Sequence, residues 1–178
     1  MDFGLWENYY KKILDDFGFE REDDEKTAQV LDDLLFEQGC LTLEDLYEKV
    51  DFSTKFIIFG AGPSLKDHIK KIKTEYDLFD HVLVAADGAT TALTEEKIVP
   101  DIIATDLDGK IDDILYANAY GANLVIHGHG NNLEAILKYT PFFDNVLGTT
   151  QAQAHGNLYN FGGFTYGDRS MFLAVALR

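Results

Sequence analysis

The apolar residues of the first 50 positions recur at intervals of three and four, the spacing that places side chains on one face of an α-helix. Thr42 is followed three positions later by Asp45, the pattern of a capping box that opens a helix over 43–50. We therefore expect helices throughout this part of the chain. The two apolar series are Trp6, Tyr9, Tyr10, Ile13, Leu14 and Phe17, and then Val30, Leu31, Leu34 and Leu35.

From Lys55 onward the apolar residues gather in short β-rich runs that alternate with helical stretches. This alternation predicts an α/β fold: a three-layer, Rossmann-like, mostly parallel sheet with helices on both faces, preceded by an N-terminal helical segment. Right-handed crossovers would bring the C-terminal ends of all strands to one edge. The expected strands are 56–59, 81–85, 101–104, 123–126 and 143–147, and the expected helices are 65–74, 89–97, 111–120 and 133–139.

The chain is divided accordingly into an acidic helical segment, residues 1–53, and a Rossmann-like domain, residues 54–178. The final stretch, residues 170–178, reads as a helix that is apolar on almost every side. Such a helix belongs beneath other structure. We expect it to be covered by a second copy in a homo-oligomer or by a natural continuation of a C-terminally truncated chain.

Charge and cysteine content narrow the possible partners. The net charge is −16, and residues 1–53 hold 16 acidic and 5 basic residues. Such a field repels nucleic acid and anionic lipid, so we expect neither as a partner, and a polyanionic ligand would need local neutralisation. The single cysteine, Cys40, and the absence of a signal-peptide pattern or long apolar run favour a cytoplasmic protein.

The most informative motif is the apolar run that ends in Asp106-Leu107-Asp108-Gly109. Side chains alternate along a strand, so Asp106 and Asp108 can point the same way with their Cα atoms about 7 Å apart. Paired carboxylates suit Mg²⁺, which prefers one or two of them together with water and substrate phosphates. The alternative is an ordinary strand end followed by an Asp-Gly turn.

Two glycine-containing turns lie earlier in the chain. Gly60, Ala61, Gly62, Pro63 and Ser64 connect a strand to a helix, where free amides and the helix dipole favour a phosphate. A tight turn that needs small residues would look the same. Asp87 and Gly88 follow the next strand; Asp87 fits a third metal ligand, a ribose-binding residue or the cap of the following helix.

Two further motifs follow later strands. His127 and His129 are too few for a tetrahedral zinc site, so we expect them to line a ligand pocket, while Asn131 or Asn132 caps the next helix. Asp168 fits a metal ligand or proton acceptor, and Arg169 fits stabilisation of a transferring phosphoryl group; a helix-starting acid beside an exposed arginine is the alternative. Tyr159, Phe161 and Phe164 fit either a stacking wall or core packing.

Taken in order, the motifs at Gly60–Leu65, Ala86–Ala89, Pro100–Gly109, His127–Asn131 and Gly162–Arg169 resemble the archaeal 6-hydroxymethyl-7,8-dihydropterin diphosphokinase family over residues 55–178. The catalytic fold is also similar to that of thiamine pyrophosphokinases. The resemblance implies Mg²⁺-dependent transfer of diphosphate from ATP to the pterin's hydroxymethyl oxygen, releasing AMP, in tetrahydromethanopterin or folate biosynthesis.

The resemblance also implies roles for individual residues. The magnesium ligands would be Asp87, Asp106, Asp108 and Asp168; Asp106, Asp108, Asp168 and Arg169 would act in catalysis; and Gly60, Ala61, Gly62, Pro63, Ser64, Asp87, Gly88, His127, His129, Asn131 and Thr165 would contact nucleotide or substrate. The partners would be ATP and a small heterocyclic alcohol. Two alternatives remain: thiamine or another small alcohol as acceptor, or a non-catalytic nucleotide-binding or glycan-assembly-associated domain.

Overall fold

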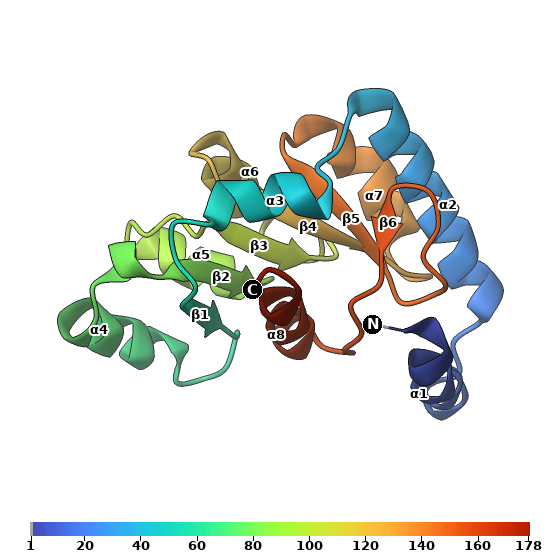
Figure 1. The fold of residues 1–178 in the computed structure, drawn as a ribbon, viewed down its shortest axis with the longest axis horizontal. Helices are drawn as coiled ribbons and strands as arrows, with labels where there is room; N and C mark the ends of the chain where they lie inside the picture. Colours follow the sequence, from blue (N-terminus) through green and yellow to red (C-terminus); the bar gives the residue numbers. More distant parts are fainter. Residues whose placement is uncertain (1) are drawn as a thin grey trace.

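The protein folds around one six-stranded, wholly parallel sheet, seen in a computed structural model that describes residues 2–178. The strands lie side by side in the order of the chain (Figure 1). The expected α/β class with its parallel sheet is therefore confirmed. The strands are β1 (Phe56–Phe59), β2 (Val82–Ala86), β3 (Ile102–Thr105), β4 (Asn123–Gly128), β5 (Val146–Thr150) and β6 (Leu158–Tyr159).

Four crossover helices connect the first five strands and pack on one face of the sheet. Because each strand is added beside the previous one in the same direction, right-handed crossovers place these helices on the same side. The connecting helices are α4 (Leu65–Glu75), α5 (Ala89–Glu95), α6 (Ile111–Ala119) and α7 (Leu133–Tyr139), with 3₁₀ turns at η1 (Leu78–Asp80) and η2 (Thr140–Phe142).

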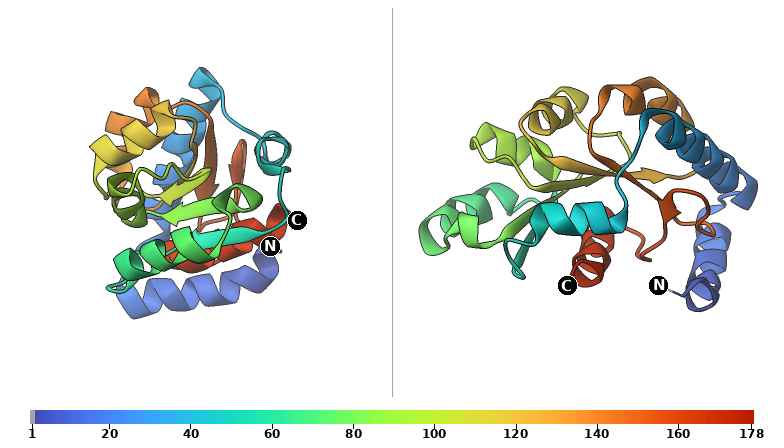
Figure 2. Two further views of the ribbon diagram at one scale, coloured as in Figure 1. Left: turned by 90° about the vertical axis from the view of Figure 1, so that its left-hand side faces the viewer. Right: turned by 45° about the horizontal axis from the view of Figure 1, so that its top comes forward.

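The remaining helices complete the three layers. Helix α2 (Arg21–Gln38) joins the crossover helices, while α3 (Leu43–Val50) and α8 (Tyr166–Ala176) cover the opposite face, as the right-hand view of Figure 2 shows. Helix α1 (Phe3–Phe17) lies beside the start of α8 and the chain that follows β5. The first 53 residues thus contribute helices to both faces of the sheet.

Side-chain alternation along the strands divides the core in two. In β2, Leu83 and Ala85 face the crossover helices, whereas Val82 and Val84 face α3 and α8. Both sets are almost completely buried, which explains why the inner strands read as continuous apolar runs. Helix α2 adds Ala28, Leu31 and Leu35 to the first core, and α3 adds Leu46 and Val50 to the second.

Up to β5 the element boundaries agree with the sequence pattern to within two residues, and the larger differences lie from β5 onward. The expected strand 143–147 begins only at Val146, because η2 and the positive φ of Asn145 keep the preceding residues out of the sheet. The two-residue strand β6 was not predicted, since a run of that length gives no periodic signal. Helix α8 begins at Tyr166, four residues before the expected start, and its apolar residues lie partly against the sheet and partly exposed.

No helix in residues 2–178 combines the length and the apolar character that a membrane crossing requires.

Candidate active site at the strand ends

Three carboxylates meet at the C-terminal ends of β2 and β3. Oxygen atoms of Asp87, Asp106 and Asp108, here called the strand-end cluster, lie within 4.8 Å of one another. Strand alternation was expected to bring Asp106 and Asp108 together. However, β3 ends at Thr105, and neither aspartate lies on it. Left-handed backbone conformations at Asp87, with φ of 42°, and at Leu107, with φ of 67°, turn the chain there. Turn geometry, and not strand alternation, brings the carboxylates together.

Neighbouring residues hold Asp87 in place. The Thr105 hydroxyl donates a 2.6 Å hydrogen bond to Asp87 Oδ1 and accepts one of 2.8 Å from the Leu107 amide. A Cβ atom on Gly109 would lie 3.1 Å from Asp87 Oδ2, so a glycine at that position leaves room for the carboxylate. The side chain of Asp87 therefore points toward the turn after β3 and does not serve mainly as a helix cap.

Two carboxyl groups of the strand-end cluster have pKa values shifted in opposite directions. Burial alone would raise the pKa of Asp106, but polar contacts with His129, Asp108 and Tyr166 outweigh it and lower that pKa to about 2. Burial, followed by the neighbouring Asp106 and Asp87 carboxylates, raises the pKa of Asp108 to about 7. Asp106 thus stays ionised, whereas Asp108 retains its proton to a higher pH than a free carboxyl does, and a cation would displace that proton.

The strand-end cluster has the donor chemistry of a hard divalent cation site. Carboxylate oxygens are the ligands that Mg²⁺ prefers, and Mg²⁺ is normally held by few of them. Oδ1 of Asp106 is shielded from solvent and has no hydrogen-bond partner among residues 2–178. A buried carboxylate oxygen without a partner is costly, so a bound cation would satisfy an atom that the protein leaves unpaired.

Asp168 and Thr165 are not part of this cluster. Asp168 Oδ1 accepts a 2.8 Å hydrogen bond from the Thr165 hydroxyl, and its oxygens also accept from the Phe164 and Arg169 amides. The Thr165 hydroxyl in turn caps α8 by accepting from the Asp168 amide. Both side chains are therefore engaged at the start of α8, and Asp168 as a fourth metal ligand stays a prediction.

The loop after β4 carries the two histidines. His129 Nε2 lies 3.1 Å from Asp106 Oδ2, so this ring contacts the strand-end cluster directly. Asn131 is exposed, whereas Asn132 is buried and ties the loop together. Its amide nitrogen donates to the carbonyl oxygens of Asp106 and His127, at 2.9 and 2.7 Å, and its oxygen accepts from the His129 amide. Asn132 thus braces β3 against β4 and makes no side-chain cap.

His127 is buried and neutral. Burial, with the nearby positive charge of Arg169, keeps its pKa well below the usual value. Its Nδ1 lies 3.1 Å from the Thr149 hydroxyl, which itself donates to the Ile126 carbonyl. Nδ1 must therefore carry the proton, and Nε2 remains an acceptor without a partner among the described residues.

Arg169 and Tyr166 lie beside His127 at the start of α8. They line a cavity of about 20 Å³ together with Gly162 and Gly163. Arg169 donates to Gln151 Oε1 at 3.0 Å, but its Nε and Nη1 are shielded from solvent and have no partner within residues 2–178. Burial raises the pKa of Tyr166 above its usual value, as does the nearby Asp106 carboxylate, so its hydroxyl stays protonated.

The turn formed by Gly60, Ala61, Gly62, Pro63 and Ser64 is exposed at the end of β1. It lies beside the Asp87 turn, because a Cβ on Gly88 would be 3.5 Å from that of Ala61. The amides of Gly62 and Leu65 bond within the turn, and Ser64 makes no side-chain cap. Open space surrounds the Cα atoms of both glycines, and neither has a positive φ, so nothing in the protein itself requires glycine there.

The aromatic residues expected to form a stacking wall mainly contact other parts of the protein. Tyr159 and Phe161 stack on each other with centroids 5.7 Å apart, and the Tyr159 hydroxyl accepts from the Leu43 amide. Phe164 packs against Phe17 of α1. Only Phe161 of these three lines the small cavity.

Sequence reasoning missed three residues that shape the site, Thr105, Gln151 and Tyr166, and it expected Asn131 or Asn132 only as a helix cap. Thr105 directly precedes the acidic motif, and a strand-end threonine before Asp-x-Asp could have suggested a side-chain bond to a neighbouring turn. Tyr166 stands three residues before Arg169, on a spacing that places both on one side of a helix. Gln151 has no local signal, because its partners are distant in the sequence.

Comparisons with known proteins identify the family of the chain. The family described as 6-hydroxymethylpterin diphosphokinase MptE-like matches residues 33–178, so the match begins earlier than the motif region at 55–178. A 6-hydroxymethyl-7,8-dihydropterin pyrophosphokinase from Methanothermobacter thermautotrophicus is 52% identical over 99% of this chain and 74% of its own length.

Proteins of the same name from Methanocaldococcus jannaschii and Pyrococcus furiosus are each 41% identical over 98% of this chain, which covers 74% and 72% of their lengths. These matches confirm the resemblance seen in the ordered motifs. The chain belongs to the 6-hydroxymethylpterin diphosphokinase MptE-like family.

Proposed function

We propose that this protein transfers a diphosphoryl group from ATP to the hydroxymethyl oxygen of 6-hydroxymethyl-7,8-dihydropterin and releases AMP. The names of the relatives support the acceptor and the reaction class. The observation that carries the proposal is the strand-end cluster, with its unpaired Asp106 oxygen. In the reaction, the hydroxymethyl oxygen bonds to the β-phosphorus, and the bond from the β-phosphorus to the oxygen bridging to the α-phosphorus breaks. AMP leaves with that oxygen, and the hydroxyl proton passes to solvent.

Asp87, Asp106 and Asp108 would hold Mg²⁺, whose charge, when bound, offsets the negative charge of the polyphosphate. Asp106 stays ionised because its pKa is low, and its contact with His129 fixes the orientation of the carboxylate. Asp108 gives up its proton when the cation is loaded, because its pKa is near 7. These side chains therefore prepare a compact anionic site in a strongly acidic protein.

Arg169 is the cation best placed to meet the phosphates. Two of its guanidinium nitrogens are buried without partners in the described chain, so they are ready to donate to phosphate oxygens. The exposed Gly60–Ser64 turn, beside Asp87, would allow the backbone to approach the nucleotide closely. His127 offers an unpaired acceptor at Nε2, which suits an N–H group of a heterocycle.

The test is to incubate the protein with Mg²⁺, ATP and 6-hydroxymethyl-7,8-dihydropterin and to measure AMP and ADP separately. Pterin-dependent AMP without ADP is the expected result. ADP formation would indicate transfer of a single phosphoryl group and would overturn the proposal. Absence of both products, with AMP appearing when thiamine replaces the pterin, would move the acceptor to thiamine. Binding of Mg-ATP without turnover of any alcohol would identify a binding domain.

A further inference from the structure

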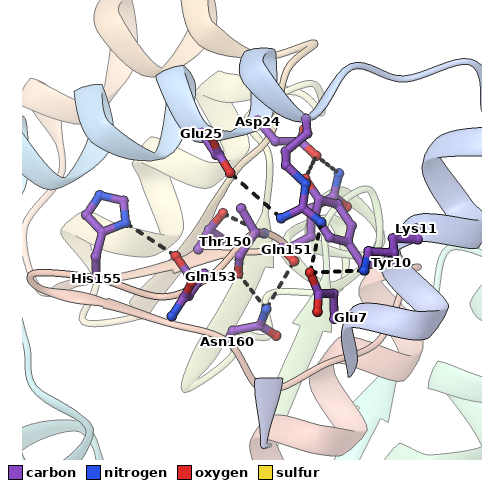
Figure 3. A network of polar contacts seen from close by, with 12 residues as sticks. Glu7, Tyr10, Lys11, Asp24, Glu25, Thr150, Gln151, Gln153, His155 and Asn160 are labelled. Carbon is purple, nitrogen blue, oxygen red and sulfur yellow. Dashed lines mark hydrogen bonds and ion pairs between the residues drawn. The ribbon is translucent and has the colours of Figure 1, made fainter. Parts of the chain in front are cut away.

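A buried carboxylate outside the strand-end cluster connects the N-terminal helices to the candidate site. Asp24 of α2 is 2% exposed and accepts three hydrogen bonds. Its Oδ2 accepts from the Tyr10 hydroxyl at 2.7 Å and from Gln151 Nε2 at 2.8 Å, and its Oδ1 accepts from the Gly130 amide at 2.7 Å. Figure 3 shows Tyr10 and Gln151 converging on this carboxylate. We call these four residues the Asp24 network.

The Asp24 network continues into the site through Gln151. Its side-chain oxygen accepts the 3.0 Å hydrogen bond from Arg169 Nη2 while its side-chain nitrogen donates to Asp24. The amide of Gln151 thus has both ends occupied. Its backbone carbonyl also accepts from Trp6 Nε1 of α1 and from Asn160, which fixes the residue at the end of β5. Asp24 therefore helps to hold the Gln151 amide with its oxygen toward Arg169.

The orientation of that amide matters for Arg169. Only the oxygen end can accept from a guanidinium, and the nitrogen end needs an acceptor such as Asp24. With Asp24 in place, one corner of the guanidinium is tied down while Nε and Nη1 remain unpaired. Without it, the Gln151 nitrogen would lose its acceptor, and of these two hydrogen bonds only the one from Arg169 would still orient the amide.

The charge of Asp24 is also suited to this role. No lysine, arginine or histidine among residues 2–178 forms an ion pair with it. Burial raises the pKa of Tyr10, and the bond to Asp24 raises it further, so Tyr10 always donates. Burial lowers the pKa of Arg169, while nearby acidic groups that include Asp24 oppose that effect. The positive charge of Arg169 is thus supported from a distance.

We propose that Asp24 is a positioning residue for Arg169, acting through Gln151, and that the acidic N-terminal helix α2 is in this way part of the phosphate-binding apparatus. The proposal rests on the proposed function in one respect: it assigns Arg169 to the polyphosphate. Asp24 itself touches no substrate in this arrangement.

The first experiment compares Asp24→Asn with Asp33→Asn. Both substitutions remove one negative charge from α2, but Asp33 is exposed, and within residues 2–178 its side chain is bonded to Gln29 alone. Calorimetric titration with Mg-ATP and steady-state kinetics with the pterin are measured well below the melting temperature. Asp24→Asn should weaken Mg-ATP binding about tenfold and lower kcat about 10–100-fold, with the KM for the pterin nearly unchanged. Asp33→Asn should stay within about twofold in all three quantities.

The second experiment separates positioning from general destabilisation. Asp24→Asn is combined with Arg169→Ala, and its effect on Mg-ATP affinity should largely disappear in that background, because the residue it positions is gone. An equal loss with and without Arg169 would overturn the proposal. If Asp24→Asn does not fold, Gln151→Met replaces it in the same cycle, since Asp24 then keeps Tyr10 and Gly130.

The outcomes also distinguish the two proposals. Mg-ATP binding that depends on Asp24 and Arg169 together, without AMP formation from the pterin, would support the positioning role and reject the proposed reaction. AMP formation that is unaffected by Asp24→Asn would support the reaction and reject the positioning role. If the unsubstituted protein bound no Mg-ATP, both proposals would be overturned.

Discussion

The strand-end cluster and the Asp24 network are both built from aspartates held by hydrogen bonds, but they differ in what they leave unsatisfied. Asp106 is 8% exposed and keeps one oxygen without a partner in the described chain. Asp24 is 2% exposed and has both oxygens occupied by donors from three separate segments. Two carboxylates of similar burial therefore differ in whether an oxygen remains available to a ligand.

The difference follows from where the donors come from. Asp24 is surrounded by neutral N–H and O–H groups that stabilise a charge without competing for it. Asp106 keeps Oδ1 unpaired, and burial together with the Asp106 and Asp87 carboxylates disfavours a negative charge on Asp108, so the strand-end cluster as a whole lacks a compensating positive charge until a cation arrives. A buried carboxylate whose oxygens are all hydrogen-bonded is expected to stabilise the fold. A buried carboxylate with an unpaired oxygen is expected to bind a cation. Substitutions at the two places should therefore affect different measurements.

The largest expected effect is on activity, from Asp106→Asn. Loss of the ionised ligand should reduce the rate of AMP formation about 10²–10³-fold and weaken Mg²⁺ binding, because the site then lacks its strongest anionic donor. The melting temperature should change less than in Asp24→Ala, because the loss of the charged contact with His129 is partly offset by the relief of repulsion with Asp87 and Asp108. Asp112→Asn, an exposed acid on α6, is the matched control. Undiminished Mg²⁺ binding by Asp106→Asn would reject the cluster as the metal site.

For Asp24→Ala, we expect the largest change in the free energy of unfolding. Removing the carboxylate leaves the donors of Tyr10, Gln151 and Gly130 without their acceptor in a buried region, so the free energy of unfolding should fall by about 2–4 kcal/mol. Denaturant titration measures this fall. If Asp24→Ala and Asp106→Ala lost equal stability, the contrast between the two carboxylates would be wrong.

The contrast also explains how much of the molecule could be predicted from sequence. The strand-end cluster lies on turns that directly follow apolar runs, and parallel topology sends those turns to one edge. Fold class, most element boundaries and the Asp87, Asp106 and Asp108 grouping could therefore be inferred. The reason for the grouping could not, because positive φ angles at Asp87 and Leu107 are properties of the folded backbone.

The Asp24 network has no comparable signal. Asp24 is one of four consecutive acidic residues at 22–25, and nothing in the sequence distinguishes it from its exposed neighbours. Its partner Gln151 is 127 residues away, and only the packing of α2 on the sheet brings them together. For Asp168 the sequence did give a signal, since its motif suggested a metal ligand. In the structure, its carboxylate accepts a local hydrogen bond from the Thr165 hydroxyl at the start of α8.

A smaller effect is expected from pH on cation binding. Because folding raises the pKa of Asp108 to about 7, a cation must displace its proton at lower pH. Apparent Mg²⁺ affinity should fall about tenfold per pH unit below 7 and level off above it. In the free protein this group favours the fold most below about pH 4 and loses that contribution as pH rises through 7. Added Mg²⁺ should therefore raise the melting temperature more at pH 8 than at pH 5.5; an equal rise would contradict this assignment.

The smallest expected effect concerns a third kind of carboxylate, satisfied entirely by its neighbours in sequence. Asp45 accepts from the Thr42 amide at 2.7 Å, and the Thr42 hydroxyl accepts from the Asp45 amide at 3.1 Å, which forms the predicted capping box of α3. Thr42→Ala should lower the melting temperature by about 2–4 °C, because one helix cap is lost. Helix α3 packs on the face of the sheet through Leu46 and Val50, and neither residue lines the site cavity. AMP formation should therefore stay unchanged in Thr42→Ala. A loss of activity there as large as in Asp24→Asn would show that any destabilisation of the N-terminal helices impairs the site, and the special role of Asp24 would not stand.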